Sequence, residues 1–121
     1  MKRLLAATTT LLVAGSLAAC STTESAEQIS SDAVILDVRT AEEIADSGLL
    51  DGAQHYDFNS GELATALPQL DPDAEYGIYC RSGNRAGQAK SVMEDAGFTD
   101  VTNLGSLQDA VDTTGLQIVK P

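Results

Sequence analysis

A continuous segment of this chain, residues 76–97, combines an apolar run, a short polar loop and a helical pattern with no linker between them. Residues 76–79 (Tyr-Gly-Ile-Tyr) are typical of a buried strand. The loop Cys80-Arg81-Ser82-Gly83-Asn84-Arg85 follows at once. After the loop, small and apolar residues recur at helical spacing: Ala86, Ala89, Val92, Met93 and Ala96. A strand that leads directly into a helix is the repeating unit of parallel sheets, so the segment predicts an α/β domain.

Short apolar segments alternate with helix signals on both sides of this unit. We expect further strands at residues 34–38, 53–58, 101–104 and 117–119. Thr40 and Glu43 have the spacing of a capping box, which predicts a helix from Thr40 to Gly48. Two further short helices are expected, at residues 60–67 and 106–111. These elements predict one domain over residues 32–121, with a mainly parallel sheet of about five strands flanked by short helices.

The N-terminal residues 1–19 have the pattern of a cleaved export signal. A basic start, Met1-Lys2-Arg3, precedes an uncharged stretch of apolar and small residues. The sequence Leu17-Ala18-Ala19-Cys20 resembles the bacterial lipobox, which implies that Cys20 is the lipidated mature N-terminus. An ordinary secreted protein cut near that point is the alternative. Residues 20–31 are rich in Ser, Thr and Glu, which is typical of a flexible tether. We therefore expect an exported domain, anchored by lipid on the extracytoplasmic or periplasmic face of a cell membrane.

The composition is acidic. Seven Lys and Arg residues stand against 18 Asp and Glu residues, and the formal net charge at pH 7 is −11. Binding to nucleic acid, or to anionic lipid headgroups by charge, needs a basic surface, so we expect neither. His55 is the single histidine and has no cysteine near it in sequence, so no metal site is expected. No Gly-rich nucleotide loop is present and no cofactor is expected.

Cys80 occupies the place where α/β folds bind ligands, beyond the carboxyl end of a strand. The free N–H groups at the start of the next helix, the helix dipole, and the charges of Arg81 and Arg85 all favour an anion there. A thiol in such surroundings is largely thiolate at neutral pH and therefore nucleophilic. If Cys20 is lipidated, Cys80 also has no disulfide partner. A small buried apolar residue at a strand end is the alternative, but it explains neither the arginines nor Ser82-Gly83-Asn84.

The chain resembles the single-domain rhodanese family. The resemblance spans about residues 31–119 and rests, in chain order, on Ile35-Leu36-Asp37-Val38-Arg39, Gly52-Ala53, Tyr79 through Ala86, Ala96-Gly97-Phe98 and Val101-Thr102-Asn103-Leu104. It implies a three-layer rhodanese-like α/β domain and a sulfurtransferase. In this family a cysteine takes a sulfane sulfur from thiosulfate or a similar anionic donor, carries it as a persulfide, and passes it to cyanide or a thiol.

Carried over to this chain, the resemblance makes Cys80 the catalytic nucleophile. The active-site loop that cradles the charged sulfur and binds the donor would then be Arg81, Ser82, Gly83, Asn84 and Arg85. The charged pair Asp37 and Arg39 is expected to support this loop structurally. Phosphatases of the superfamily have one more residue in the loop, whereas four residues separate Cys80 from Arg85 here, which favours sulfur transfer.

The chain departs from the family pattern in two places. Leu49 replaces the usual His, which we interpret as structural drift, and Ala110 stands where many members have a Trp near the pocket rim. The second departure leaves the substrate preference open. A binding or sensing module that reports a persulfide or redox state to a partner without turnover is the alternative function, and a thiol redox protein is a candidate partner. The retention of Cys80 with Arg81 and Arg85 favours the enzyme.

Overall fold

A computed structural model describes residues 29–121 of the chain. The expected signal peptide, the lipobox cysteine and most of the expected tether lie outside these residues. Within them, no helix is long and apolar enough to cross a membrane.

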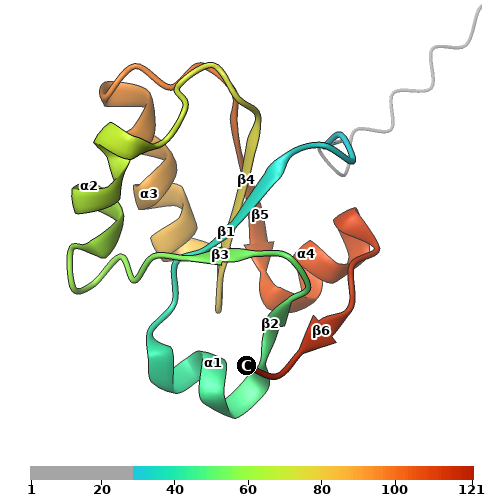
Figure 1. The fold of residues 1–121 in the computed structure, drawn as a ribbon. Coiled ribbons are helices and arrows are strands. Elements are labelled where there is room, and N and C mark those ends of the chain that lie inside the picture. Colours follow the sequence, from blue (N-terminus) through green and yellow to red (C-terminus); the bar gives the residue numbers. More distant parts are fainter. Residues whose placement is uncertain (1–28) are drawn as a thin grey trace, which may run out of the picture.

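The centre of the domain is a parallel sheet in the order β3-β1-β4-β5 (Figure 1). Its strands are β1 (Val34–Asp37), β3 (Gln54–His55), β4 (Tyr76–Cys80) and β5 (Val101–Ser106). All residues of β4 are buried, as expected for a central strand covered on both faces. The carboxyl ends of β1 and β4 lie together, because Asp37 is the register partner of Tyr79.

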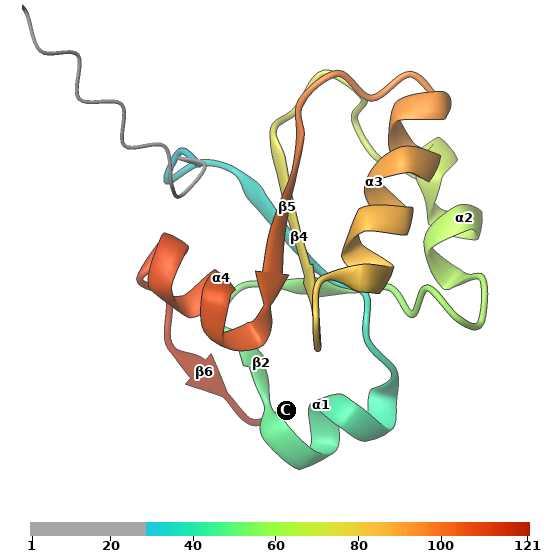
Figure 2. The ribbon, with the colours of Figure 1, turned by 180° about the vertical axis from the view of Figure 1, so that it is seen from behind.

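Helices cover both faces of the sheet and complete a three-layer α/β domain. One face packs against α2 (Glu62–Ala66) and α3 (Asn84–Asp95), which lie together to one side of the sheet in Figures 1 and 2. The other face packs against α4 (Leu107–Thr114), whose Ala110 is fully buried. The seven-residue helix α1 (Ala41–Ser47) lies near the carboxyl ends of the strands. The capping box predicted at Thr40 and Glu43 is present, with both of its hydrogen bonds.

The mainly parallel central sheet is confirmed, and it has four strands where about five are expected. The expected last strand becomes β6 (Ile118–Val119), which pairs antiparallel with β2 (Leu49–Leu50) in a separate ribbon. The N–H of Asp51 donates to the carbonyl of Gln117 and extends this pairing. The apolar pattern correctly predicts a strand at this place in the chain. The pairing partner of β6 depends on the path of the chain after α4, and a local apolar pattern carries no information about that path.

Two elements are shorter than expected. The strand expected over residues 53–58 is limited to β3. Beyond it, the N–H of Tyr56 donates to the carbonyl of Asp37, the last residue of β1, and the N–H of Phe58 donates to the carbonyl of Val38, which follows β1, as single, separated bonds. The helix expected over residues 60–67 is α2, followed by a 3₁₀ turn, Leu67–Gln69, that includes Pro68. A proline is compatible with the first turn of a helix, because the backbone N–H groups there have no acceptor within the helix and the one that proline lacks is not needed. Pro68 accordingly lies in the first turn of the 3₁₀ segment, where α2 has ended.

The packed domain begins at least three residues earlier than the expected boundary at residue 32. Ile29 packs against the core cluster that contains Ile35 and Leu104. The backbone N–H of Ser30 donates to the Glu75 carboxylate at 3.2 Å. Ile29 to Ser31, placed in the tether by composition, therefore belong to the folded unit.

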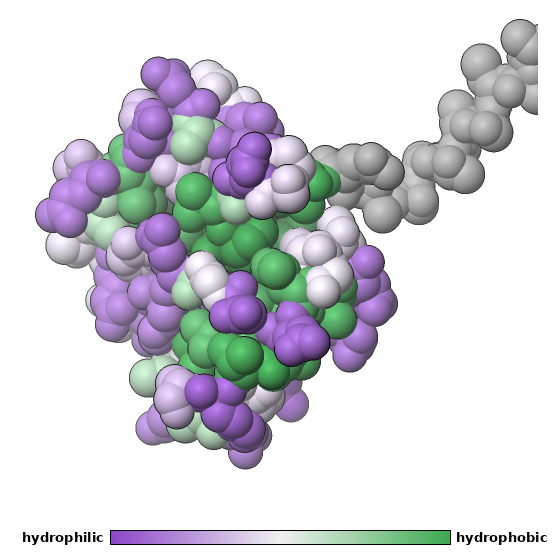
Figure 3. Space-filling model, turned by 45° about the vertical axis from the view of Figure 1, so that its right-hand side comes forward, coloured by the Kyte–Doolittle hydropathy of each residue, from purple (hydrophilic) through white to green (hydrophobic). Residues whose placement is uncertain are grey.

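Figure 3 shows apolar side chains gathered at the centre of one face of the molecule, with hydrophilic ones around its margin.

Candidate active site

Cys80 is the last residue of β4, and it is fully buried. Its Sγ atom accepts a hydrogen bond from the backbone N–H of Gly83 at 2.9 Å. The strand, the loop and this bond together hold the sulfur at the start of α3, as the sequence predicts.

The loop turns sharply at Gly83. This residue adopts φ +92°, a left-handed conformation in which side chains are strained, and α3 begins at the next residue, Asn84. A Cβ atom at position 83 would lie 3.2 Å from the Cα of Gly105 on β5. Glycine is thus needed both for the turn and for the close approach of the loop to the neighbouring strand.

Arg85 forms a two-pronged ion pair with Glu43 of α1. Its Nη1 and Nη2 atoms donate to the two carboxylate oxygens at 2.7 and 2.8 Å. This bond is the main reason why the pKa of Glu43 is lowered to about 2, and the same bond raises the pKa of Arg85. One N–H of each Nη atom is therefore used in holding the loop to that helix, whereas the resemblance implies that the arginine binds the donor.

Asp37 and Arg39 form a buried network beside Tyr79, the residue before Cys80. The Arg39 guanidinium donates to both Asp37 carboxylate oxygens, and its carbon lies 5.6 Å from the centroid of the Tyr79 ring. Burial alone lowers the pKa of Arg39, but the hydrogen bonds and charge of Asp37 outweigh it and raise that pKa. The Tyr79 hydroxyl accepts the N–H of Leu50 at 2.9 Å, and burial raises the pKa of Tyr79. These contacts fit the expected supporting role of the pair.

A pocket of about 440 Å³ lies beside the loop at Arg81, and Cys80 itself does not line it. Ser106, the register partner of Cys80, and Arg81, which follows Cys80 in the chain, both belong to its wall. The full lining is Arg39, Glu43, Asp46, Ser47, Arg81, Ser106, Leu107 and Gln108. In residues 29–121 the ion pairs involve Arg39 and Arg85, so Arg81 is the loop cation without an ion pair among the described residues.

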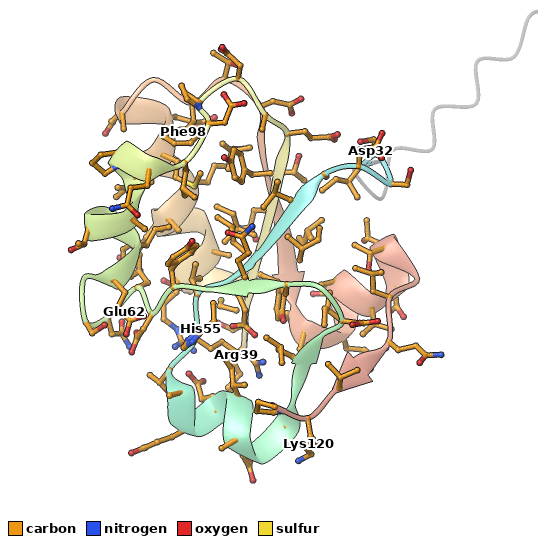
Figure 4. The ribbon with its side chains drawn as sticks, viewed as in Figure 1. Asp32, Arg39, His55, Glu62, Phe98 and Lys120 are labelled. Carbon is orange, nitrogen blue, oxygen red and sulfur yellow. The ribbon has the colours of Figure 1, made fainter. Side chains whose placement is uncertain are left out.

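Ala110 and His55 stand apart from this pocket. Ala110 is fully buried in the core beside Leu50 and Tyr79, so it does not form the pocket rim that the family comparison implied for its position. Leu107 and Gln108 of the same helix line the pocket instead. The Nε2 of His55 donates to the carbonyl of Arg39 at 2.7 Å, and the two residues lie side by side in Figure 4. Among the residues that the structure describes, no three His, Cys, Asp or Glu side chains form a cluster that could hold a metal.

The structure brings the predicted site residues together. Residues 80–85 run from the last residue of β4 through a short turn into the first residues of α3, which begins at Asn84 and so shortens the loop expected through Arg85. Asp37 of the buried pair is the register partner of Tyr79, the residue before Cys80. The capping-box pattern predicts only a capping role for Glu43, and its bond to Arg85, 42 positions away, has no signal in the sequence. The contact of Asn103 with the loop is likewise not predicted. The sole signal for Asn103 was its place in the motif Val101-Thr102-Asn103-Leu104.

Comparison with known proteins agrees with this geometry. The family model of the Rhodanese-like domain matches residues 21–110. The chain is 40% identical over 47 residues to thiosulfate sulfurtransferase PspE of Escherichia coli strain K12, and this match covers 39% of the chain and 43% of PspE. It is 32% identical over 90 residues to a sulfurtransferase of Allochromatium vinosum, covering 74% of the chain and 81% of that protein. A match to a tRNA sulfurtransferase of Shewanella halifaxensis spans 16% of the length of that protein.

Solved structures show the same fold. A rhodanese with anions from E. coli superimposes with a TM-score of 0.59 at 30% identity, covering 73% of this chain and 98% of that one. The human single-domain sulfurtransferase TSTD1 superimposes with a TM-score of 0.55 at 27% identity, covering 66% of this chain and 81% of that one. The chain belongs to the rhodanese-like domain family.

Proposed function

We propose that the protein is a sulfurtransferase that moves a sulfane sulfur from thiosulfate or a similar small anionic donor to a thiophilic acceptor through a persulfide on Cys80. The observation that carries the proposal is the buried Cys80 Sγ with the Gly83 N–H directed at it, at the start of α3. The sulfurtransferase names of the relatives support the same reaction class.

The reaction has two steps on the same sulfur atom. The Cys80 thiolate attacks the sulfane sulfur of thiosulfate, the S–S bond of the donor breaks, and sulfite leaves with the bonding electron pair. The terminal sulfur of the resulting persulfide carries the negative charge. Cyanide or a thiolate then attacks that terminal sulfur, the persulfide S–S bond breaks, and the Cys80 thiolate is restored.

The loop residues have different roles in this reaction. The Gly83 N–H and the free N–H groups of the first turn of α3 stabilise the charged sulfur. Arg81, exposed on the pocket wall, attracts the donor anion. Arg85 fixes the loop through Glu43, a role that replaces direct donor binding in this proposal. The burial of Cys80 favours donors small enough to enter the loop.

Intact mass spectrometry tests the reaction. The full chain carries Cys20→Ala in every sample, so that Cys80 is the only thiol. Thiosulfate should add the mass of one sulfur atom, cyanide should remove it as thiocyanate, and Cys80→Ser should abolish both changes. A mass gain that neither cyanide nor a thiol can reverse would favour the sensing module. The absence of any gain with thiosulfate, persulfides and thiosulfonates would refute sulfur transfer.

We also propose that the protein is an exported lipoprotein, on the strength of the sequence alone. The lipobox-like Leu17-Ala18-Ala19-Cys20 and the charge-free stretch before it support this, and they lie outside the described residues. Cys20→Ala should release the protein from the membrane fraction or leave it unprocessed. A correctly processed Cys20→Ala protein that stays with the membrane would contradict the proposal.

A further inference from the structure

The side chain of Asn103 joins the Cys80 loop to the neighbouring strand. Its Nδ2 donates to the carbonyl oxygen of Gly83 at 3.0 Å, and its Oδ1 accepts the N–H of Gly105 at 2.9 Å. One amide group therefore uses its donor on the active-site loop and its acceptor on β5. Asn103 is half-buried, so water competes only partly for these two bonds.

A β-bulge in β5 sets the position of Asn103. Ile78 pairs with Asn103 and Tyr79 pairs with Gly105, so Leu104 is an extra residue between the two pairs. Bulges bend a strand locally and re-aim its side chains. Here the bulge coincides with a left-handed Gly105 at φ +87°, and regular pairing resumes at Cys80 and Ser106. The irregular part of β5 thus lies directly beside the loop that holds the sulfur.

Gly83 is the residue that contacts both Asn103 and the Cys80 sulfur. The N–H of Gly83 donates to Cys80 Sγ, and the carbonyl of the same residue is the group that Asn103 holds. A glycine at positive φ has wide backbone freedom. The Gly83 carbonyl also accepts the helical N–H of Gly87 at 3.0 Å, so the bond from Asn103 is a second constraint on the residue whose N–H is directed at the sulfur. The Cα of Gly105 also restricts the space beside Gly83, since a Cβ atom at position 83 would lie 3.2 Å from it.

We propose that Asn103 is a positioning residue for the reactive sulfur, which it serves by clamping Gly83 so that the Gly83 N–H stays directed at Cys80. The proposal rests on the proposed sulfur transfer and adds a specific residue to it. Without the clamp, the thiolate and the charged persulfide lose part of their stabilisation while the fold remains. In enzymes, removal of one donor to a developing anion lowers the rate about 10²–10³-fold. Asn103 acts one residue away from that donor, so we expect a loss of about tenfold.

The test compares Asn103→Ala and Asn103→Asp in the full chain with Cys20→Ala. Asn103→Ala removes both bonds without adding charge. Asn103→Asp keeps an acceptor for the Gly105 N–H, but once ionised it has no donor for the Gly83 carbonyl. Thr102→Ala is the matched control, since Thr102 is also half-buried and precedes Asn103 on the same strand. Two rates are measured: alkylation of Cys80 by iodoacetamide over a range of pH, and single-turnover persulfide formation with thiosulfate.

Both Asn103 variants should shift the midpoint of the alkylation profile to higher pH and slow persulfide formation about tenfold. Thr102→Ala should match the parent. A lower unfolding temperature with an unchanged alkylation midpoint and unchanged rates of the folded fraction would show a merely structural role and overturn the proposal. Parent-like behaviour of Asn103→Asp alone would also overturn it, since the Gly105 bond would then suffice. If Asn103→Ala does not fold, Asn103→Ser replaces it with the same expected shifts.

The alkylation profile separates this proposal from the proposed function. If the parent protein forms no persulfide with any donor, sulfur transfer fails. The pH midpoint of alkylation still decides whether Asn103 controls the environment of Cys80, because alkylation needs no sulfur donor.

Discussion

The ion pair between Glu43 and Arg85 predicts a specific pH dependence of stability. The pKa of Glu43 is lowered from its ordinary value of 4.5 to about 2, mainly by the hydrogen bond from Arg85. A pKa lowered this far corresponds to an upper limit of roughly 3 kcal/mol of folding free energy at neutral pH. The Arg85 and Glu43 side chains are 19% and 24% exposed, so water screens the pair, and we expect about 1–2 kcal/mol.

The sign of the effect follows from the lowered pKa. The stabilisation is fully present above about pH 4.5, where Glu43 is also ionised in the unfolded chain. It is lost as the pH falls from there towards about 2, where the folded protein takes up the proton. Glu43→Gln removes the charge and keeps a residue type that can complete the capping box with Thr40.

Urea unfolding of the parent and of Glu43→Gln over a series of pH values measures this difference. The variant should be less stable by about 1–2 kcal/mol at neutral pH, and the two proteins should converge near pH 2. Glu42→Gln is the matched control, because Glu42 is exposed and lies in the same first turn of α1. A Glu43→Gln difference that is constant with pH, or no larger than that of Glu42→Gln, would refute the reasoning.

Three further predictions follow from the buried network, the loop turn and the pocket wall. Asp37→Ala leaves the Arg39 charge buried without its partner and should destabilise the protein by about 3–5 kcal/mol in urea unfolding; a loss under about 1 kcal/mol would contradict the network. Gly83→Ala places a Cβ atom 3.2 Å from the Cα of Gly105 in a residue with φ +92°. Sulfur loading of Cys80 by thiosulfate, measured by mass spectrometry, should therefore fall strongly while the unfolding temperature changes little, and unchanged loading would contradict the need for glycine at this turn. Arg81→Ala should raise KM for thiosulfate with little change in kcat, and an unchanged KM in a steady-state thiocyanate assay would remove Arg81 from donor binding.

Local patterns in the sequence were enough to predict the strand, loop and helix around Cys80. The apolar run of β4, the turn-forming residues after it and the helical spacing of α3 all act over a few neighbours, so they are visible without the fold. The capping box of α1 is also local, and it is present as predicted. The parallel arrangement followed from the alternation of strands and helices.

Contacts between distant segments were not available from these patterns. The pairing of β6 with β2, and with it the four-stranded central sheet, depends on the path of the chain after α4. The packing of Ile29 against the core depends on a surface built by strands and a helix that follow it in the chain. A composition rich in Ser, Thr and Glu identifies a tether only where no such surface is near.

The same division holds within the active site. The sequence by itself was enough to single out Cys80 as the candidate nucleophile, together with the residues after it, because a thiol, two arginines and a helix start lie within a few residues of one another. Only the tertiary structure shows that Arg85 is ion-paired, since Glu43 lies 42 residues before Arg85 and contacts it through the placement of α1. It alone also shows the two bonds of Asn103, because the bulge at Leu104 has no signature in the apolar pattern of β5. Hydrogen bonds between side chains on different elements depend on distances of a few tenths of an ångström, and those distances are set only when the sheet and its helices are packed together.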